Sequence, residues 1–161
     1  VIAKNQESFF YLKNLFQDRK IKKFYLALVH GKPKEPKGVI DIPMGRIGMK
    51  RTTQLHGKKK LKDEKTAVTE YSTLKNFRDF TLLEVSPHTG RTHQIRVHLK
   101  SIGNPVAGDP LYGHKKIASR KEPERLFLHA YKLQFTSPDG KSLALETDLP
   151  EDLQKFLNEL E

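Results

Sequence analysis

The stretch that decides the fold runs from Pro87 to Gly113 and reads PHTGRTHQIRVHLKSIGNPVAGDPLYG. It follows alternating apolar residues that are typical of a strand, and it opens with a glycine turn. Beyond the turn the periodicity becomes helical. The apolar residues on that helical face are Ile95, Leu99 and Ile102. With Thr92 as the expected N-cap and Gly103 at the expected end, the pattern predicts a short buried helix.

Two arginines flank the start of this helix. Arg91 lies just before its N-terminus and Arg96 lies within it. A cation in the first turns opposes the helix dipole, and a guanidinium buried alone is costly. A buried Arg96 therefore needs an anionic partner, either a carboxylate or a phosphate. The alternative, that both arginines are simply exposed, stays open at this point.

The segments around this stretch predict an α+β domain. Helices are expected from Asn5, a plausible N-cap, to Asp18 and from Pro150 onward. Strands are expected at Lys23–Val29, Val39–Ile42, Arg51–His56, Thr66–Leu74, Phe80–Ser86, Leu128–Phe135 and Ser142–Thr147. Gly108–Glu124 has the composition of a loop. The expected fold is a mixed, largely antiparallel sheet with a few flanking helices in one domain over residues 1–161.

Composition restricts the function classes. The chain has 161 residues, 30 Lys plus Arg against 19 Asp plus Glu, a net charge of +11, and no cysteine. One hydrophobic core is expected at this length. Without cysteine there is no thiolate nucleophile and no Cys-ligated zinc, and a cytoplasmic location is favoured. The apolar runs are far shorter than the roughly 20 residues of a membrane-spanning helix.

The positive charge is concentrated in the first part of the chain, where residues 1–65 hold 17 Lys or Arg and 6 Asp or Glu. The densest cluster consists of Arg46, Lys50, Arg51, Lys58, Lys59, Lys60, Lys62 and Lys65. Such a cluster favours a polyphosphate partner, and a pI near 9.8 points to nucleic acid. A solvated lysine-rich loop is the competing interpretation.

Two short motifs suggest other chemistries. His88, His93 and His98 surround the predicted helix, but the last two are five residues apart and do not share a helical face, so structural histidines are favoured and no metal is assigned. Gly45–Gly48 matches the G-x-x-G loop of KH domains, which bind nucleic-acid backbones. Its flanks are strand-like rather than helical, which argues against a KH domain.

Four segments together resemble the RluA family of RNA pseudouridine synthases. They are KKFYLALVHGK from Lys22, TAVTEYSTL from Thr66, LLEVSPHTGRTHQIRVHLKSIGNPVAGDPLYG from Leu82 and RLFLHAYKLQFTSPDGK from Arg125. Their order and separations are family-like and span nearly the whole chain. The resemblance implies the pseudouridine synthase fold and an isomerase that converts uridine to pseudouridine in flipped-out RNA nucleotides without a cofactor.

The resemblance also implies roles for individual residues. Tyr25 corresponds to the tyrosine that stacks on the uracil and is the candidate base for its C5 proton. Arg96 corresponds to the basic residue that pairs with the catalytic aspartate, and Leu128 to the apolar wall against the base. Arg91 and the cluster from Arg46 to Lys65 then correspond to phosphate contacts that position the RNA. A packed core tyrosine and a packed core leucine are the competing interpretations for Tyr25 and Leu128.

The family's nucleophilic aspartate motif, His-Arg-Leu-Asp followed by Thr-Ser-Gly, is not found in this chain. In the family it ends directly before a stretch like VIAKN, with which this chain begins at Val1. None of the aspartates here stands in that context: Asp18, Asp41, Asp63, Asp79, Asp109, Asp139, Asp148 and Asp152. We therefore expect a fragment of the catalytic domain that is inactive alone, with an unpaired sheet edge next to Val1.

The expected substrate is ribosomal RNA, with transfer RNA as the alternative, and the expected state is a monomer. A different class of function, a non-catalytic RNA-binding module acting in ribosome assembly, also fits the basic composition. The two differ in whether the aspartate motif precedes these residues. A metal-dependent RNA enzyme that uses the histidines is a third, more distant hypothesis.

Overall fold

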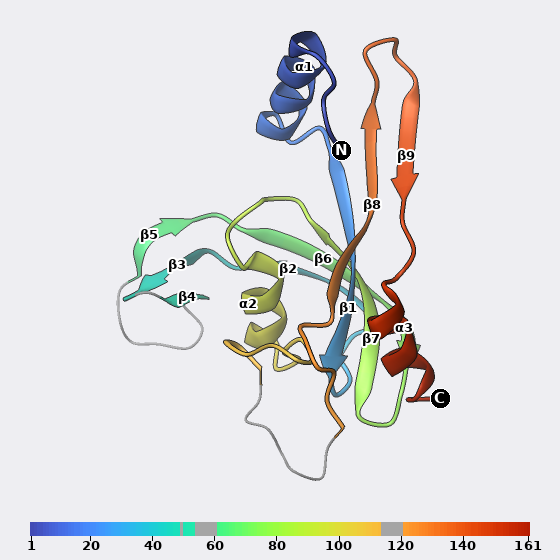
Figure 1. Cartoon of the computed structure of the whole chain (residues 1–161). Coiled ribbons are helices and arrows are strands. Elements are labelled where there is room, and N and C mark those ends of the chain that lie inside the picture. The colour runs from blue at the N-terminus through green and yellow to red at the C-terminus, as the bar shows by residue number, and fades with distance from the viewer. Residues whose placement is uncertain (49, 54–60, 114–120) are drawn as a thin grey trace.

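The computed structural model describes the whole chain except residues 49, 54–60 and 114–120. The elements are α1 (Gln6–Gln17), β1 (Lys22–His30), β2 (Lys37–Asp41), β3 (Met44–Ile47), β4 (Lys50–Thr53), β5 (Lys62–Lys65), β6 (Val68–Asn76), β7 (Phe80–Pro87), α2 (Gln94–Ser101), β8 (Leu128–Thr136), β9 (Ser142–Glu146) and α3 (Glu151–Asn158). Six strands form one sheet in the order β2-β6-β7-β1-β8-β9 (Figure 1). Among the described residues its pairings are antiparallel, which confirms the predicted α+β class.

The two faces of the sheet carry separate apolar cores because β1 is buried on both sides. Ala27 and Val29 pack with Ile95 and Leu99 of α2 on one face. Leu28 packs on the other face, where α3 supplies further apolar side chains. Fully buried residues on consecutive positions of β1 are what its continuous apolar sequence predicts. Consequently α2 and α3 cover opposite faces of the same strands.

A smaller sheet of β4, β3 and β5 extends to one side of the molecule (Figure 1). The strand expected at Arg51–His56 corresponds to β4, of which residues beyond Thr53 lie outside the described part. The sequence did not predict β3 and β5 as strands. Both are four residues long. In β3 (MGRI) the first two residues are buried and the last two are exposed, and β5 (KDEK) is exposed along its whole length, so neither strand shows the alternation of apolar and polar residues that predicts a strand.

The helix α1 begins at the N-cap residue that the sequence predicts. Asn5 is the N-cap, and its side chain accepts a hydrogen bond from the backbone N–H of Ser8 at 2.8 Å. The helix lies beside the tip of the β8–β9 hairpin (Figure 1), and the hydroxyl of Tyr11 donates to the carbonyl of Thr136 at 2.8 Å. In the described residues no helix is long and apolar enough to span a bilayer.

The start of α2 differs from the prediction. The N-cap is His93 rather than Thr92, and its side chain makes no capping hydrogen bond. His93 has φ 60°, in the left-handed region that a residue with a side chain seldom adopts. At the other end, Gly103 has φ 88° directly after the C-cap Ile102, so the predicted helix end is confirmed.

Candidate active site

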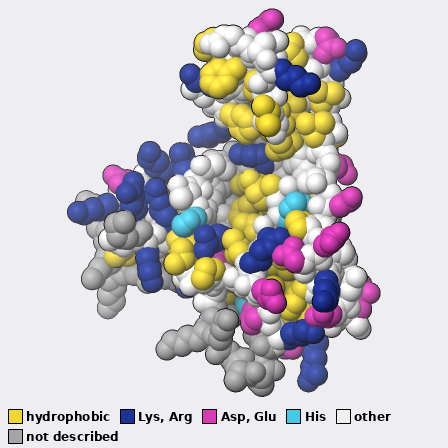
Figure 2. Space-filling view, viewed as in Figure 1, with side chains coloured by type: hydrophobic (Ala, Val, Ile, Leu, Met, Phe, Trp, Pro, Cys, Tyr) yellow, Lys and Arg dark blue, Asp and Glu magenta, His cyan; other side chains and the backbone are white. Residues whose placement is uncertain are grey.

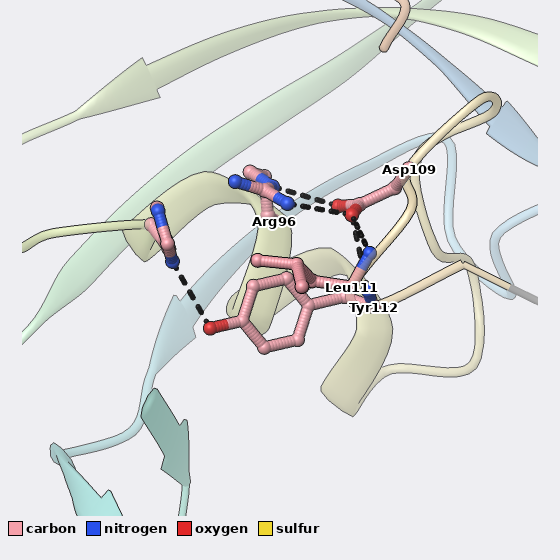
Figure 3. Close-up of polar contacts among 5 residues, drawn as sticks. Arg96, Asp109, Leu111 and Tyr112 are labelled. Atoms are coloured by element: carbon pink, nitrogen blue, oxygen red, sulfur yellow. Dashed lines mark hydrogen bonds and ion pairs between the residues drawn. The ribbon is translucent and has the colours of Figure 1, made fainter. Parts of the chain in front are cut away.

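Arg96 of α2 makes a buried ion pair with Asp109 (Figure 3). Its Nε donates to Oδ2 at 2.7 Å and its Nη2 donates to Oδ1 at 2.6 Å, so the pair is bidentate. The side chain of Arg96 is 12% exposed and that of Asp109 is fully buried. The carboxylate is thus the anionic partner in this structure. The residue pattern required a carboxylate or a phosphate there, and the family resemblance implied the catalytic aspartate, whereas the partner within this chain is Asp109.

The loop after α2 is shaped to hold this carboxylate. Oδ1 of Asp109 also accepts the backbone N–H groups of Leu111 at 2.9 Å and Tyr112 at 3.0 Å (Figure 3). Burial by itself would raise the pKa of Asp109, but the hydrogen bonds from Arg96 and from the two backbone N–H groups lower it. Asp109 is therefore held as an anion.

Gly108 allows this loop to pack closely on the chain that leads into β8. It has φ 67°, and a Cβ at this position would lie 2.1 Å from the carbonyl oxygen of Arg125. Any other residue would force the two segments apart. The tight contact therefore fixes Asp109 relative to the start of β8.

Tyr112 covers the face of the guanidinium. The guanidinium carbon of Arg96 lies 4.9 Å from the centre of the Tyr112 ring. The Tyr112 hydroxyl lies 3.1 Å from Nδ1 of His93. Burial and the nearby Arg96 lower the pKa of His93, and burial raises the pKa of Tyr112. At neutral pH both groups are therefore uncharged, and Arg96 is stacked against a neutral ring.

Tyr25 and Leu128 lie on the same side of the sheet as α2. Tyr25 is opposite Ala130 and Leu128 is opposite Ala27 on the adjacent strand, so the two side chains are diagonal neighbours on one face. Both are partly buried against the core that includes Ile95. Burial raises the pKa of Tyr25. Both residues therefore lie on the face of the sheet that α2, the helix of Arg96, covers.

Arg96 also lines a cleft of about 780 Å³. Its wall includes His30 at the end of β1, Asp109 and Glu122. Nε2 of the buried His30 lies 3.4 Å from the Glu122 carboxylate. We call this hollow the Arg96 cleft.

A second hollow, of about 470 Å³, lies between the small sheet and the start of α2. Its cationic side chains are Arg46, Arg51, Lys65 and Arg91, and it also contains Asp63. We call it the basic cleft. Three of the predicted RNA-binding residues, Arg46, Arg51 and Arg91, are thus brought together, and Lys and Arg side chains gather over this arm (Figure 2). Lys50 is exposed on β4, whereas Lys58, Lys59 and Lys60 lie outside the described residues.

The contacts within the basic cleft leave its cations available. Nε of Arg91 donates to the carbonyl of Thr66 at 3.1 Å, which fixes the side chain without neutralising it. Nε of Arg46 lies 3.7 Å from the Asp63 carboxylate, and both groups are at least half exposed. An exposed pair of this kind is worth little. The cleft therefore keeps a net positive charge.

The three histidines of the stretch from Pro87 to Gly113 lie in three different environments. His88 is exposed and contacts Glu70 at 2.8 Å, and His93 contacts Tyr112. Nε2 of the buried His98 lies 3.0 Å from the carbonyl of Ile42, to which it donates. Within the described ranges, no three His, Asp or Glu side chains are grouped as a metal site would need.

Comparison with known proteins decides the family. The family model described as RNA pseudouridylate synthase matches residues 1–101, which include β1, β7 and α2 up to Ser101. The chain belongs to the RNA pseudouridylate synthase family. The resemblance noted in its sequence motifs is thereby confirmed, and its mainly antiparallel sheet is the pseudouridine synthase fold.

Individual relatives agree with this family. The chain is 43% identical over 98% of its length to the ribosomal large subunit pseudouridine synthase D of Nitrosomonas europaea, and covers 46% of that protein. It is 39% identical over 99% of its length to an uncharacterized RNA pseudouridine synthase of Bacillus subtilis, and covers 51% of it. The chain thus spans about half the length of these relatives.

Solved structures share the fold of the chain. The human RNA pseudouridylate synthase domain containing 1 superposes with a TM-score of 0.79 at 28% identity, over 92% of this chain and 62% of that one. The human RNA pseudouridylate synthase domain containing 4 superposes with a TM-score of 0.80 at 25% identity, over 97% of this chain and 68% of that one. The shared architecture therefore extends over nearly all of the chain.

Sequence reasoning missed Asp109 and Tyr112 as parts of the site. The sequence context of Asp109 differs from that of the family's nucleophile and indicates no other role for it. The available signal was the segment GDPLYG, in which an aspartate precedes a turn and an aromatic residue. Pairing it with Arg96, which is 13 residues earlier, requires the path of the loop, and local patterns do not give that path.

His98 makes the stability of the fold depend on pH. Burial lowers its pKa, against the opposing effect of the Ile42 carbonyl. The unfolded chain therefore binds this proton at a higher pH than the folded chain does. The free energy of unfolding should then fall as the pH drops below about 6.5. His98→Gln should cost about 1–3 kcal/mol at pH 8 and weaken the fall at acid pH, as measured by urea unfolding.

The matched control for this prediction is His88→Gln, which replaces an exposed histidine of the same segment. It should retain the loss of stability at acid pH. Identical pH dependence in His98→Gln and the unsubstituted protein would show that His98 is not the group responsible.

Proposed function

We propose that this chain carries the catalytic groups around the uridine in an RNA pseudouridine synthase that modifies ribosomal RNA. The observation that supports this most directly is the position of Arg96. It belongs to α2, the helix that covers the face of the sheet on which Tyr25 and Leu128 lie, and it lines a cleft of about 780 Å³. The family membership of the chain supports the same assignment.

The proposed reaction is an isomerisation that needs no cofactor. The bond between N1 of uracil and C1′ of ribose breaks, the base turns, and C5 is joined to C1′. The proton on C5 is then removed and N1 gains a proton, so the product is an isomer of the substrate. An aspartate attacks the nucleotide, and we assign this role to none of the aspartates of this chain. We therefore propose that the chain alone forms no pseudouridine, and that the native protein containing it does.

Each residue around the uridine has a distinct task in this proposal. Arg96 holds the attacking carboxylate ionised and oriented. Leu128 forms an apolar wall, and Tyr25 stacks on the uracil. Because burial raises its pKa, the Tyr25 hydroxyl is protonated at neutral pH. Removing the C5 proton then requires the tyrosine to lose its own proton within the complex.

The proposed RNA interface is the basic cleft together with Lys50 and the lysines at 58–60. These cations would contact phosphates and so position the RNA without reading its sequence. The concentration of positive charge in residues 1–65 supports this. Ribosomal RNA is favoured over transfer RNA because the relative from Nitrosomonas europaea is named for the large ribosomal subunit. A cytoplasmic location and a monomeric state are part of the same proposal, and the absence of cysteine favours the first of these.

Tritium release from RNA labelled at C5 of uridine tests the reaction. The native protein should release tritium from unmodified ribosomal RNA. Arg96→Ala should lower the rate by roughly 100-fold or more, the scale of losing an electrostatic catalytic group. Tyr25→Phe keeps the stacking ring and loses the hydroxyl, so it should bind RNA normally but release tritium slowly.

RNA binding without release from ribosomal or transfer RNA would contradict the proposed activity and favour an RNA-binding module. Leu74→Ala, which truncates an exposed leucine on β6, is the control and should react at the rate of the unsubstituted protein. Tritium release by the present chain alone would contradict the proposal that none of its aspartates is the nucleophile.

Salt dependence tests the basic cleft. Arg51→Gln and Arg91→Gln should each weaken RNA binding and flatten the slope of log affinity against log salt by about 0.7 per lost contact with single-stranded RNA. Filter binding or fluorescence anisotropy over a range of salt concentrations measures this slope.

Lys141→Gln is the matched control for the salt experiment, because Lys141 is an exposed cation on the turn between β8 and β9. It should leave the slope unchanged. Unchanged slopes in both arginine variants would move the RNA surface away from the basic cleft.

A further inference from the structure

We infer that Asp109 is a positioning residue for the reaction: it fixes one edge of the Arg96 guanidinium and leaves the other edge for the attacking carboxylate. This inference rests on the proposed function, which gives Arg96 its task. It adds a buried acidic group, with its supporting loop, to the residues on which catalysis depends.

The hydrogen-bond donors of Arg96 divide into two sets. A guanidinium has five N–H donors in a planar fork. Nε and Nη2 each donate once to Asp109, at 2.7 and 2.6 Å, which uses the edge that these two nitrogens form. The edge formed by Nη1 and Nη2 is not used by this pair. It has the geometry for a second bidentate carboxylate.

The surroundings leave the guanidinium little freedom to rotate. Asp109 is fully buried, and its Oδ1 accepts the N–H groups of Leu111 and Tyr112, so the carboxylate cannot swing away. The Tyr112 ring covers a face of the guanidinium. With 12% of its side chain exposed, Arg96 still lines the Arg96 cleft.

This arrangement has two physical consequences for catalysis. Arg96 remains paired when the attacking carboxylate is not in contact with it, so the cost of a buried unpaired cation is avoided. Its rotamer is also fixed before the reaction, so no ordering is needed when the nucleophile engages the remaining edge. Asp109 therefore acts through Arg96 and does not need to touch the uridine.

A double-mutant cycle in the native protein tests this. The variants are Asp109→Asn, Arg96→Ala and the double variant, and the readouts are the single-turnover rate of tritium release and the dissociation constant for ribosomal RNA. Asp109→Asn should lower the rate by roughly 10- to 100-fold, the scale on which misplacing a catalytic group by about 1 Å acts. It should leave the dissociation constant unchanged.

Coupling separates positioning from a general structural effect. If Asp109 acts through Arg96, the double variant should be no slower than Arg96→Ala alone. The matched control is Asp152→Asn, which breaks a bidentate pair with Arg125 on the exposed surface and should keep the normal rate. A normal rate in Asp109→Asn, or rate losses that multiply in the double variant, would overturn the inference.

Two further measurements keep the test decisive. If Asp109→Asn does not fold, Tyr112→Leu removes the ring from the guanidinium face, and its rate loss should likewise vanish in the Arg96→Ala background. The Arg96 Nε–H signal in nitrogen-15 NMR should exchange slowly with solvent, and rapid exchange would overturn the inference. Absence of tritium release from the unsubstituted protein, with that signal protected, would overturn the proposed function instead.

Discussion

The site depends on one buried ion pair, between Arg96 and Asp109. A guanidinium on α2 at 12% exposure requires a compensating anion, and the fully buried carboxylate supplies it through two hydrogen bonds. Removing one partner of such a pair typically costs about 3–5 kcal/mol, because the other charge is left buried and unpaired. The path of the loop from Gly108 to Gly113 is therefore constrained by the charge on the helix, and the loop in turn fixes the start of β8.

A second, uncharged network attaches α2 to the sheet. The side-chain amide of Gln94 donates to the Val68 carbonyl at 2.9 Å and to the Thr69 hydroxyl at 3.0 Å. That hydroxyl also lies 2.9 Å from Nδ1 of His98, one helical turn further on. Since Nε2 of His98 donates to a carbonyl, Nδ1 is the acceptor for the threonine hydroxyl. These hydrogen bonds from Gln94 and His98 fix the orientation of α2 about its own axis, so that Arg96 faces Asp109.

Sequence patterns predicted the parts of the fold that depend on periodicity. The continuous apolar run of β1 and the helical spacing of Ile95 and Leu99 were sufficient, because burial alone determines them. The left-handed His93 was missed, since nothing local distinguishes it from Thr92 as a cap. For Arg96 the residue pattern indicated the need for an anion, and the family resemblance implied the catalytic aspartate rather than Asp109. The pairing with Asp109 follows from tertiary structure, namely a close approach of two loops at Gly108.

The basic cleft includes Arg91 and Thr92, just before α2, and the Arg96 cleft includes Arg96 in the first turn of the same helix. Under the proposed function, one RNA strand contacts both clefts. The most direct test is a titration of the native protein with uridine-containing ribosomal RNA, followed by nitrogen-15 NMR of the arginine Nε–H groups. Signals of Arg51, Arg91 and Arg96 should shift together, while that of Arg78, in the turn between β6 and β7, should stay in place. Shifts confined to Arg78, or shifts at Arg51 and Arg91 that leave Arg96 unaffected at saturation, would contradict this account.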